Sequence, residues 1–302
     1  MCAKESASCG RQVLFVVEGK KTDPKVVKTA LEALGVETDG YSILSFGTNL
    51  HSLIRLITDG GHDEEVDFAG VELREVLADL MESGKGTLGR IDHHNMPGDD
   101  LGDPDWLRTA KITDFFLLFD FDPHASEYTE EDLYRFQCAF VDSAGDLGKL
   151  LLSYPLVEAC KEACAVADCE FMELVASEPL GDYKAAVQNR LVNDGLARFC
   201  DLRKYTAGDF AAGVSRSVAK ANALLDKGRR SDRGVALRDL ASACDEVDLP
   251  ALLKVQQEWY GSRKEVPVVG TGLFFLSIWS RELNGAEART GNGLAIETLK
   301  KP

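Results

Sequence analysis

The chain has 302 residues and a hydrophobic content of 45%, so it is long and apolar enough to bury a sizeable core in one large or two modest domains. Its formal charge of −16 argues against a protein that coats itself with nucleic acid, because affinity for phosphate backbones comes mainly from Lys and Arg. No apolar run approaches the about 20 residues that span a bilayer, and the N-terminus lacks the basic and apolar regions of a signal peptide. We therefore expect a soluble, cytoplasmic protein with no membrane partner.

Charge is unevenly distributed along the chain. Residues 60–105 contain 13 acidic and three basic residues, whereas residues 183–264 contain 15 basic and 10 acidic ones. The second segment includes Arg229 and Arg230, which belong to a short basic cluster. If a polyanion binds, we expect it to contact this C-terminal half, although a solvated helix face also explains such a cluster.

The first predicted element is a buried strand over residues 13–17, an apolar and β-branched run that ends at Glu18. Pro24 suits the first turn of a helix, and Gly35 suits its end in a left-handed conformation. A second strand is predicted over residues 41–46. Two amphipathic helices follow it, the later one inside the acidic segment.

Residues 85–108 are rich in Gly, Asp and Pro and show no periodicity, which predicts a long loop or insertion. The strongest strand pattern of the chain follows over residues 112–119 and leads into Asp120 and Asp122. Thr129 then resembles a helix N-cap, because three acidic residues come directly after it.

A fourth strand, over residues 149–154, is followed by a helix that Pro155 opens. Strands that alternate with helices predict an α/β fold with a mainly parallel sheet flanked by helices, whose ligand crevice lies outside the carboxyl ends of the strands. We expect a catalytic domain over residues 12–165, with an acidic insertion at about 60–108, and a mainly helical C-terminal domain over residues 166–302.

In the C-terminal part no strand is predicted before Val266, and Pro250 opens a late helix. The apolar run over residues 266–280 is a candidate to pack back on the first domain, as an edge strand or a helix. The eight cysteines are scattered, and the cluster around Cys160 has no neighbouring His. We therefore expect reduced, buried thiols rather than a zinc site.

An Asp or Glu just past a strand is ordinary loop chemistry, but the combination in this chain is more specific. Side chains two residues apart are separated by the strand period, so Asp120 and Asp122 can converge on one divalent ion as the chain leaves the sheet. Glu18, from a separate strand, can hold a second ion or act as a general acid or base. Gly19 would let a phosphate approach the backbone closely.

Three segments resemble motifs of TOPRIM domains, especially those of the RloB-like and overcoming-lysogenization-defect groups. VLFVVEGKKTDPKVV resembles the first motif, LLFDFDP resembles the D-x-D motif, and GKLLLSYPLVEA resembles the strand and helix that follow it. The resemblance covers residues 12 to about 165 and implies a TOPRIM-like fold that cleaves phosphodiester bonds with Mg²⁺ or Mn²⁺ as cofactor. It further implies a role in bacterial defence against phage and an ATPase partner.

Carried over to this sequence, the resemblance implies that Glu18 is the catalytic or metal-linked acid and that Asp120 and Asp122 are catalytic metal ligands. Asp23 falls near the second acid of the family, and Glu158 falls near a later one. Both are therefore further candidates for the metal site.

Substrate contacts are expected from Gly19, Lys20 and Lys149, which lie inside the resembling segments, and from Arg229 and Arg230 in the basic cluster. The expected substrate is a nucleic acid or another phosphodiester. The sequence contains no P-loop, so no nucleotide cofactor is predicted.

Two other interpretations stay open. Asp92-His93-His94 copies the D-H-H signature of DHH phosphoesterases, but the earlier motifs of that class are missing and the triplet lies in the predicted loop. Alternatively, the chain is a non-catalytic interaction module whose acidic segment mimics nucleic acid toward a basic partner. Ion dependence separates the two classes, because an interaction module need not bind Mg²⁺ or Mn²⁺.

Overall fold

The computed structural model describes residues 10–36, 39–58, 68–84, 88–94, 104–124, 129–226 and 240–290. Within them, six strands form one sheet in the order β3-β2-β1-β4-β6-β5. The strands are β1 (Gln12–Val17), β2 (Gly40–Ser45), β3 (Gly89–His94), β4 (Asp114–Asp120), β5 (Val141–Asp142) and β6 (Gly148–Ser153). The four central strands run parallel, and β3 and β5 pair antiparallel at the two edges. The predicted mainly parallel sheet is therefore confirmed.

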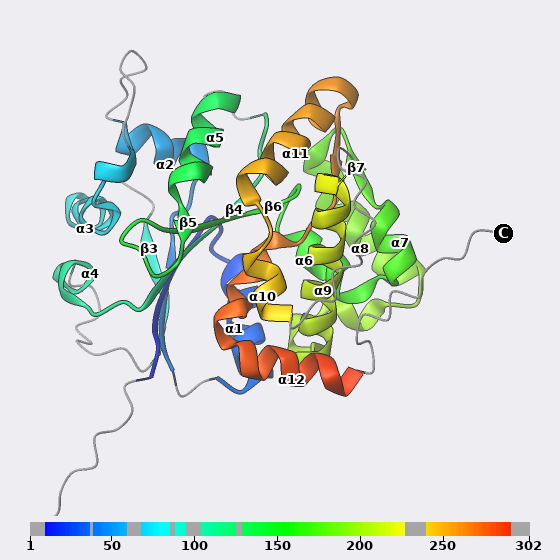
Figure 1. Cartoon of the computed structure of the whole chain (residues 1–302). Coiled ribbons are helices and arrows are strands. Elements are labelled where there is room, and N and C mark those ends of the chain that lie inside the picture. Colours follow the sequence, from blue (N-terminus) through cyan, green and yellow to red (C-terminus); the bar gives the residue numbers. More distant parts are fainter. Residues whose placement is uncertain are drawn as a thin grey trace, which may run out of the picture.

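The central strands are buried on both faces, which explains their continuous apolar sequences. Every residue of β1, β2 and β6 is buried, as are the first six residues of β4. In a parallel sheet each connection between neighbouring strands crosses over one face of the sheet, and these connections usually contain helices that cover both faces. Helices supply this cover: α2, α3 and α5 lie on one side of the sheet, and α1 and most of the C-terminal helices lie on the other (Figure 1).

Two helices of the sheet region follow predicted start or stop signals. They are α1 (Thr22–Leu34), α2 (Leu50–Ile57), α3 (Leu73–Ser83), α4 (Asp105–Thr109), α5 (Glu130–Ala139) and α6 (Glu158–Ala165). Gly35 ends α1 with a φ of 72°, which is the left-handed conformation expected of it. Thr129 caps α5, since its hydroxyl oxygen accepts a hydrogen bond from the backbone N–H of Asp132 at 3.1 Å.

The second half of the described chain is largely helical, as predicted. Its helices are α7 (Asp168–Glu173), α8 (Tyr183–Asn193), α9 (Ala207–Leu225), α10 (Leu240–Asp245), α11 (Leu249–Arg263) and α12 (Ser280–Thr290). Pro250 lies in the first turn of α11, which Asp248 caps. None of the helices in the described ranges is both long and apolar enough to cross a membrane.

Three local predictions were wrong. Residues 85–108 include the edge strand β3 and the helix α4, so the D-H-H triplet lies on a strand and not in a loop. A strand also precedes Val266, because β7 (Val175–Ser177) pairs antiparallel with β8 (Glu265–Pro267). Helix α6 begins at Glu158, three residues after the predicted Pro155. Short or edge strands have too few buried positions to show a period in the sequence.

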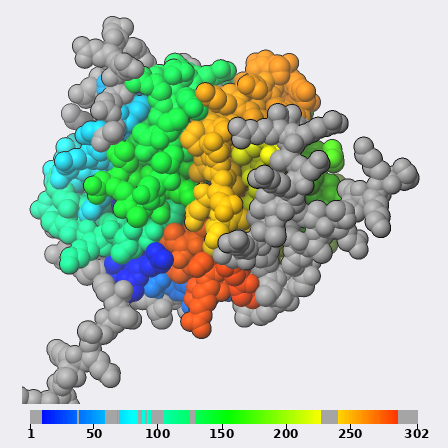
Figure 2. All heavy atoms as spheres, in the orientation of Figure 1, coloured from blue at the N-terminus to red at the C-terminus, as the bar shows by residue number. Residues whose placement is uncertain are grey.

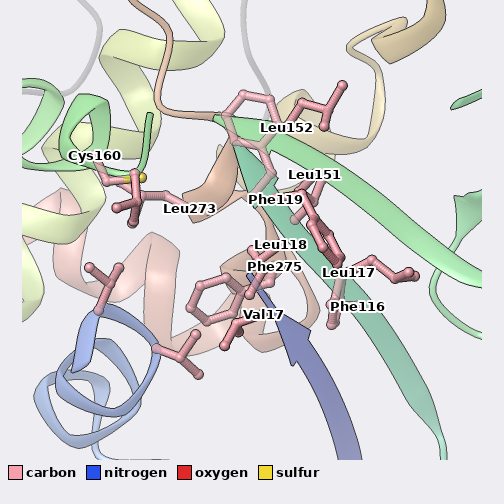
Figure 3. Close-up of a cluster of buried hydrophobic side chains, with 14 of the residues drawn as sticks. Val17, Phe116, Leu117, Leu118, Phe119, Leu151, Leu152, Cys160, Leu273 and Phe275 are labelled. Atoms are coloured by element: carbon pink, nitrogen blue, oxygen red, sulfur yellow. The ribbon is translucent and has the colours of Figure 1, made fainter. Parts of the chain in front are cut away.

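The apolar run that follows β8 packs against the sheet as a 3-10 helix, η6 (Thr271–Trp279). Its Phe275 is fully buried, with ring centroids 5.2 Å from Phe15 on β1 and 6.2 Å from Phe116 on β4. Figure 3 shows Phe275 near Val17 of β1 and Leu118 of β4, and Leu273 next to Cys160 of α6. The buried hydrophobic residues of both halves belong to one continuous cluster.

A second contact between the halves lies at the surface. Helix α11 packs beside α5, and Figure 2 shows the surfaces of these two segments meeting. Gln257 on α11 donates a side-chain hydrogen bond to the backbone carbonyl of Glu130 at 3.0 Å. The C-terminal half thus contacts the sheet region at η6 and at α5.

Candidate metal centre

The register of the parallel sheet brings Glu18 and Asp120 together. Val17 of β1 is paired with Leu118 of β4, so both strands end at the same edge. The backbone N–H of Glu18 continues the pairing by donating to the carbonyl of Leu118 at 3.0 Å. The backbone N–H of Asp120 donates to Glu18 Oε2 at 3.1 Å. The Glu18 carboxylate is therefore directed along the sheet edge toward β4.

The Asp120 carboxylate is directed toward the start of α6. Its Oδ1 accepts a hydrogen bond of 2.7 Å from the backbone N–H of Val157, the residue before α6. The next residue, Glu158, is only 3% exposed, and its Oε1 has no hydrogen-bond partner among the described residues. The nearest cations to that oxygen are Lys161 Nζ at 3.8 Å and Lys184 Nζ at 3.6 Å.

Asp23 reaches the same region from the first turn of α1. It is 8% exposed, and a Cβ built on Gly19 would lie 2.6 Å from its Oδ2. The space beside Gly19 is thus occupied by the Asp23 carboxylate. A side chain at this position would make that carboxylate shift.

Asp122 lies two residues beyond Asp120, where the chain has left the sheet. Its Oδ1 accepts a hydrogen bond from the backbone N–H of His124 at 3.0 Å, and its backbone carbonyl is 3.2 Å from His51 Nε2. The intervening Phe121 is buried against Tyr154. Asp122 is close enough to the site for its negative charge to raise the pKa of Glu18.

These carboxyl groups destabilise each other's charged forms. Burial, together with the charges of Asp23 and Asp122, raises the pKa of Glu18 to about 7. Burial raises the pKa of Asp23 to about 6, with a contribution from Glu158. Burial also raises the pKa of Asp120 well above its usual range, reinforced by Glu18, Asp23 and Glu158. The site therefore holds more negative charge than its surroundings neutralise.

The chemistry of the donors fits a hard divalent cation. The neighbouring side chains of Glu18, Asp23, Asp120 and Glu158 offer carboxylate oxygens. These are the ligands that Mg²⁺ and Mn²⁺ prefer. Cys160 lies nearby, but burial raises the pKa of its thiol to about 12, so it stays protonated and is a poor metal ligand. The unpartnered Glu158 Oε1 is one acceptor that a cation would satisfy.

The side chains do not stand in coordination geometry. Among the described residues, no group of three or more His, Cys, Asp and Glu side chains is arranged to hold one ion. One carboxylate oxygen of Glu18 instead accepts a hydrogen bond from the backbone N–H of Asp120, and one of Asp120 accepts from the backbone N–H of Val157. Ion binding at this site therefore requires at least one carboxylate to move.

The structure does not bring every predicted site residue to this edge. Lys149 lies near the start of β6, four residues and about 13 Å before the carboxyl end of that strand. Its ammonium group forms an ion pair with Asp245 at 3.0 Å. Lys20 is exposed in the loop before α1. Arg229 and Arg230 lie outside the described residues.

The D-H-H triplet is also separate from the carboxylate site. Asp92 forms an ion pair of 2.7 Å with Lys28, and the ring of His94 stacks on Tyr41 at the beginning of β2. The side chain of His93 lies outside the description. Because β3 runs antiparallel, His94 is paired with the amino end of β2, whereas Glu18 follows the carboxyl end of β1.

Sequence reasoning missed the contributions of Val157, Lys161 and Lys184. The backbone N–H of Val157 carries no side-chain signal, and Lys184 comes from α8, far along the sequence. Lys161 had a usable signal, because it is three residues after Glu158 on one helix and therefore lies on the same face.

Comparison with known proteins found no matching family model, no matching curated protein and no matching solved structure.

Proposed function

We propose that this chain is a Mg²⁺- or Mn²⁺-dependent phosphodiesterase that acts on nucleic acid. The observation that carries the proposal is the cluster of Glu18, Asp23, Asp120 and Glu158, whose negative charges are mutually repulsive at one edge of a parallel sheet. Burying several carboxylates side by side costs stability unless positive charge offsets their repulsion, so such a cluster is best explained by a cation that binds there. The resemblance to TOPRIM motifs supports the same chemistry.

A bound divalent ion would supply charge stabilisation on a phosphoryl oxygen and would lower the pKa of an attacking water. The chain itself supplies a proton carrier, because a Glu18 pKa of about 7 allows both protonation states near neutral pH. The N–H of Asp120 orients that carboxyl group. Lys161 and Lys184, at the Glu158 side of the cluster, are positioned to neutralise phosphate oxygens.

The test is a cleavage assay with Mn²⁺ on four labelled substrates: single-stranded DNA, duplex DNA, tRNA and a small chromogenic phosphodiester. Wild type is compared with Glu18→Gln, which keeps the size of the side chain and removes its charge. The matched control is Glu246→Gln, an exposed residue after α10 at the other end of the sheet. We expect the control to keep wild-type activity and Glu18→Gln to lose about 100-fold or more.

Two results would contradict the proposal. Cleavage that still requires Mn²⁺ but is unaffected by Glu18→Gln would place the active site elsewhere. Absence of cleavage and of Mn²⁺ binding in the wild type would favour the interaction-module interpretation. Loss of activity in EDTA and recovery with Mn²⁺ are expected for the enzyme.

A further inference from the structure

A cavity of about 570 Å³ lies between α1 and the 3-10 turn η4 (Leu202–Lys204). Five basic residues contribute to its lining: Lys21, Lys25, Lys28, Lys161 and Arg203. Among the described residues that line it, two are acidic, Glu32 and Asp201. A local excess of positive charge is notable in a chain whose formal charge is −16. We call this cavity the basic groove.

The lysines of the basic groove follow one face of a helix. Lys21, Lys25 and Lys28 are spaced by four and three residues, which places them on one stripe of α1. The core residues of α1 are buried on the other side of the helix: Val26, Val27, Ala30 and Leu31. From Lys21 to Lys28 the stripe extends about 10 Å along the helix axis. It can therefore contact a ligand that carries more than one phosphate.

The cations differ in how far they are already neutralised. Lys28 pairs with Asp92 at 2.7 Å, and Arg203 pairs with Asp201 at 2.9 Å. Lys21 and Lys25 are exposed and have no ion-pair partner among the described residues. These two lysines are therefore available to an anion without breaking an internal ion pair.

The basic groove adjoins the carboxylate cluster. Lys161 lines the groove, and its Nζ is 3.8 Å from Glu158 Oε1. Lys21 also lines the groove and is two residues before Asp23, another member of the cluster. A ligand in the groove thus extends from the candidate metal centre along α1. None of the described residues that line it is aromatic, so bases have no ring to stack on.

We propose that the basic groove binds phosphates of a single nucleic-acid strand next to the phosphodiester that the carboxylate cluster cleaves. The identity of the strand as substrate rests on the proposed function. Contacts from lysines to phosphates are sequence-independent and strongly salt-dependent. The volume suits a few nucleotides of one strand, since it falls within the range of pockets for small ligands.

The experiment measures binding without cleavage. The fluorescence anisotropy of a labelled single strand of about ten nucleotides is followed in EDTA at several salt concentrations. The test variant is Lys21→Glu/Lys25→Glu. The control, Lys111→Glu/Lys254→Glu, makes the same change in net charge at residues outside the groove, and circular dichroism verifies the fold of each. We expect the test variant to bind at least about tenfold more weakly and to lower the salt slope by about 1.4, with a small effect in the control.

Equal weakening in both variants would overturn the inference, because it would show a response to net charge alone. A strand that does not bind the wild type would overturn it too. Competition with a nucleoside triphosphate tests whether the groove prefers a strand or a free nucleotide. If the triphosphate binds through Lys21 and Lys25 and the strand does not, the groove is a nucleotide site. Cleavage with Mn²⁺ is measured separately. Groove-dependent binding without cleavage would reject the proposed function and leave only the binding of a strand by the groove.

Discussion

The backbone N–H of Asp120 donates a hydrogen bond to the side chain of Glu18 at 3.1 Å. This bond connects two neighbouring strands at the point where each leaves the sheet, and it orients a carboxyl group that burial has made hard to ionise. Because the donor is a backbone group, it persists when the side chain at position 120 is changed. The role of the Asp120 carboxylate can therefore be tested without moving Glu18.

Asp120→Asn should abolish metal-dependent activity and leave the metal-free protein as stable as wild type or more stable by about 1 kcal/mol. Asn keeps an oxygen that can accept from the N–H of Val157, but it removes the charge that a hard cation requires. Thermal unfolding in EDTA measures the stability. The control is Asp194→Asn, an exposed residue at the end of α8, which should match wild type.

The same proteins allow a test for the ion. Mn²⁺ at about 100 times its Kd should stabilise wild type by about 2.7 kcal/mol, because the ion binds only the folded protein. It should have little effect on Asp120→Asn. Equal stabilisation of both proteins would locate the ion elsewhere, and unfolding of Asp120→Asn in EDTA would make Asp120 a structural residue.

The metal-free protein should lose stability as the pH rises from about 4.5 to about 7. The pKa of Glu18 is raised from 4.5 to about 7, and that of Asp23 is raised from 3.8 to about 6. Between the unfolded and folded pKa values the folded protein binds more protons than the unfolded one, so a rise in pH through that window destabilises it. Because one pKa unit corresponds to about 1.4 kcal/mol, the two groups together should lower the free energy of unfolding by several kcal/mol across this window.

Urea unfolding at a series of pH values in EDTA measures this dependence. Glu18→Gln should flatten the decrease, whereas the exposed control Glu246→Gln should keep it. A free energy of unfolding that rises with pH over this window in wild type would contradict the raised pKa values. Added Mn²⁺ should reverse the trend, because the ion binds the ionised carboxylates.

The parallel sheet could be predicted because its central strands are buried on both faces. The apolar runs of β1 and β4 lead directly to Glu18 and Asp120, so these two were identifiable as strand-end carboxylates. Edge strand β3 was missed because its sequence, GRIDHH, is mostly polar and lies in a Gly- and Asp-rich segment. Strand β7 is only three residues long, which is too short to show a period.

The residues around the candidate site were harder to predict than the site itself. Asp23 and Glu158 were expected near it through resemblance, but their burial depends on how α1 and α6 pack. The groove lysines were visible as a stripe on the polar face of α1, a pattern that most often marks a solvated face. Only the position of η4, far along the chain, encloses that stripe as a cavity.

Phe275→Ala should destabilise the protein by about 3–5 kcal/mol, because it removes a fully buried ring that contacts Phe15 and Phe116. Since this ring joins the C-terminal half to the sheet, we expect far-UV circular dichroism and tryptophan fluorescence to report one common transition at a lower denaturant concentration. Val192→Ala, at a 53% exposed position, is the control and should change stability by less than about 0.5 kcal/mol. Two separate transitions in wild type would show that the halves unfold independently.

Gly19→Ala should lower both Mn²⁺ affinity and activity, although alanine is the smallest change available. The new Cβ would lie 2.6 Å from Asp23 Oδ2, closer than two non-bonded atoms can approach, so the buried carboxylate must shift. Because the crowded atom is at the end of a side chain, we expect a cost in stability at the lower end of the range for overpacking, about 1 kcal/mol. The backbone N–H of Gly19 also stabilises the charged Asp23, and a shifted side chain loses that hydrogen bond. Gly181→Ala is the control, because a Cβ there meets nothing within 4 Å.

Isothermal titration with Mn²⁺ and thermal unfolding in EDTA measure the two effects of Gly19→Ala. A second variant, Gly19→Ala/Asp23→Ala, separates crowding from loss of the ligand. The smaller side chain at position 23 removes the clash, so the double variant should recover the stability that Gly19→Ala loses. Its Mn²⁺ affinity should stay low if Asp23 belongs to the metal site. Wild-type affinity in the double variant would show that Asp23 is not a ligand and would reduce the site to Glu18, Asp120, Asp122 and Glu158.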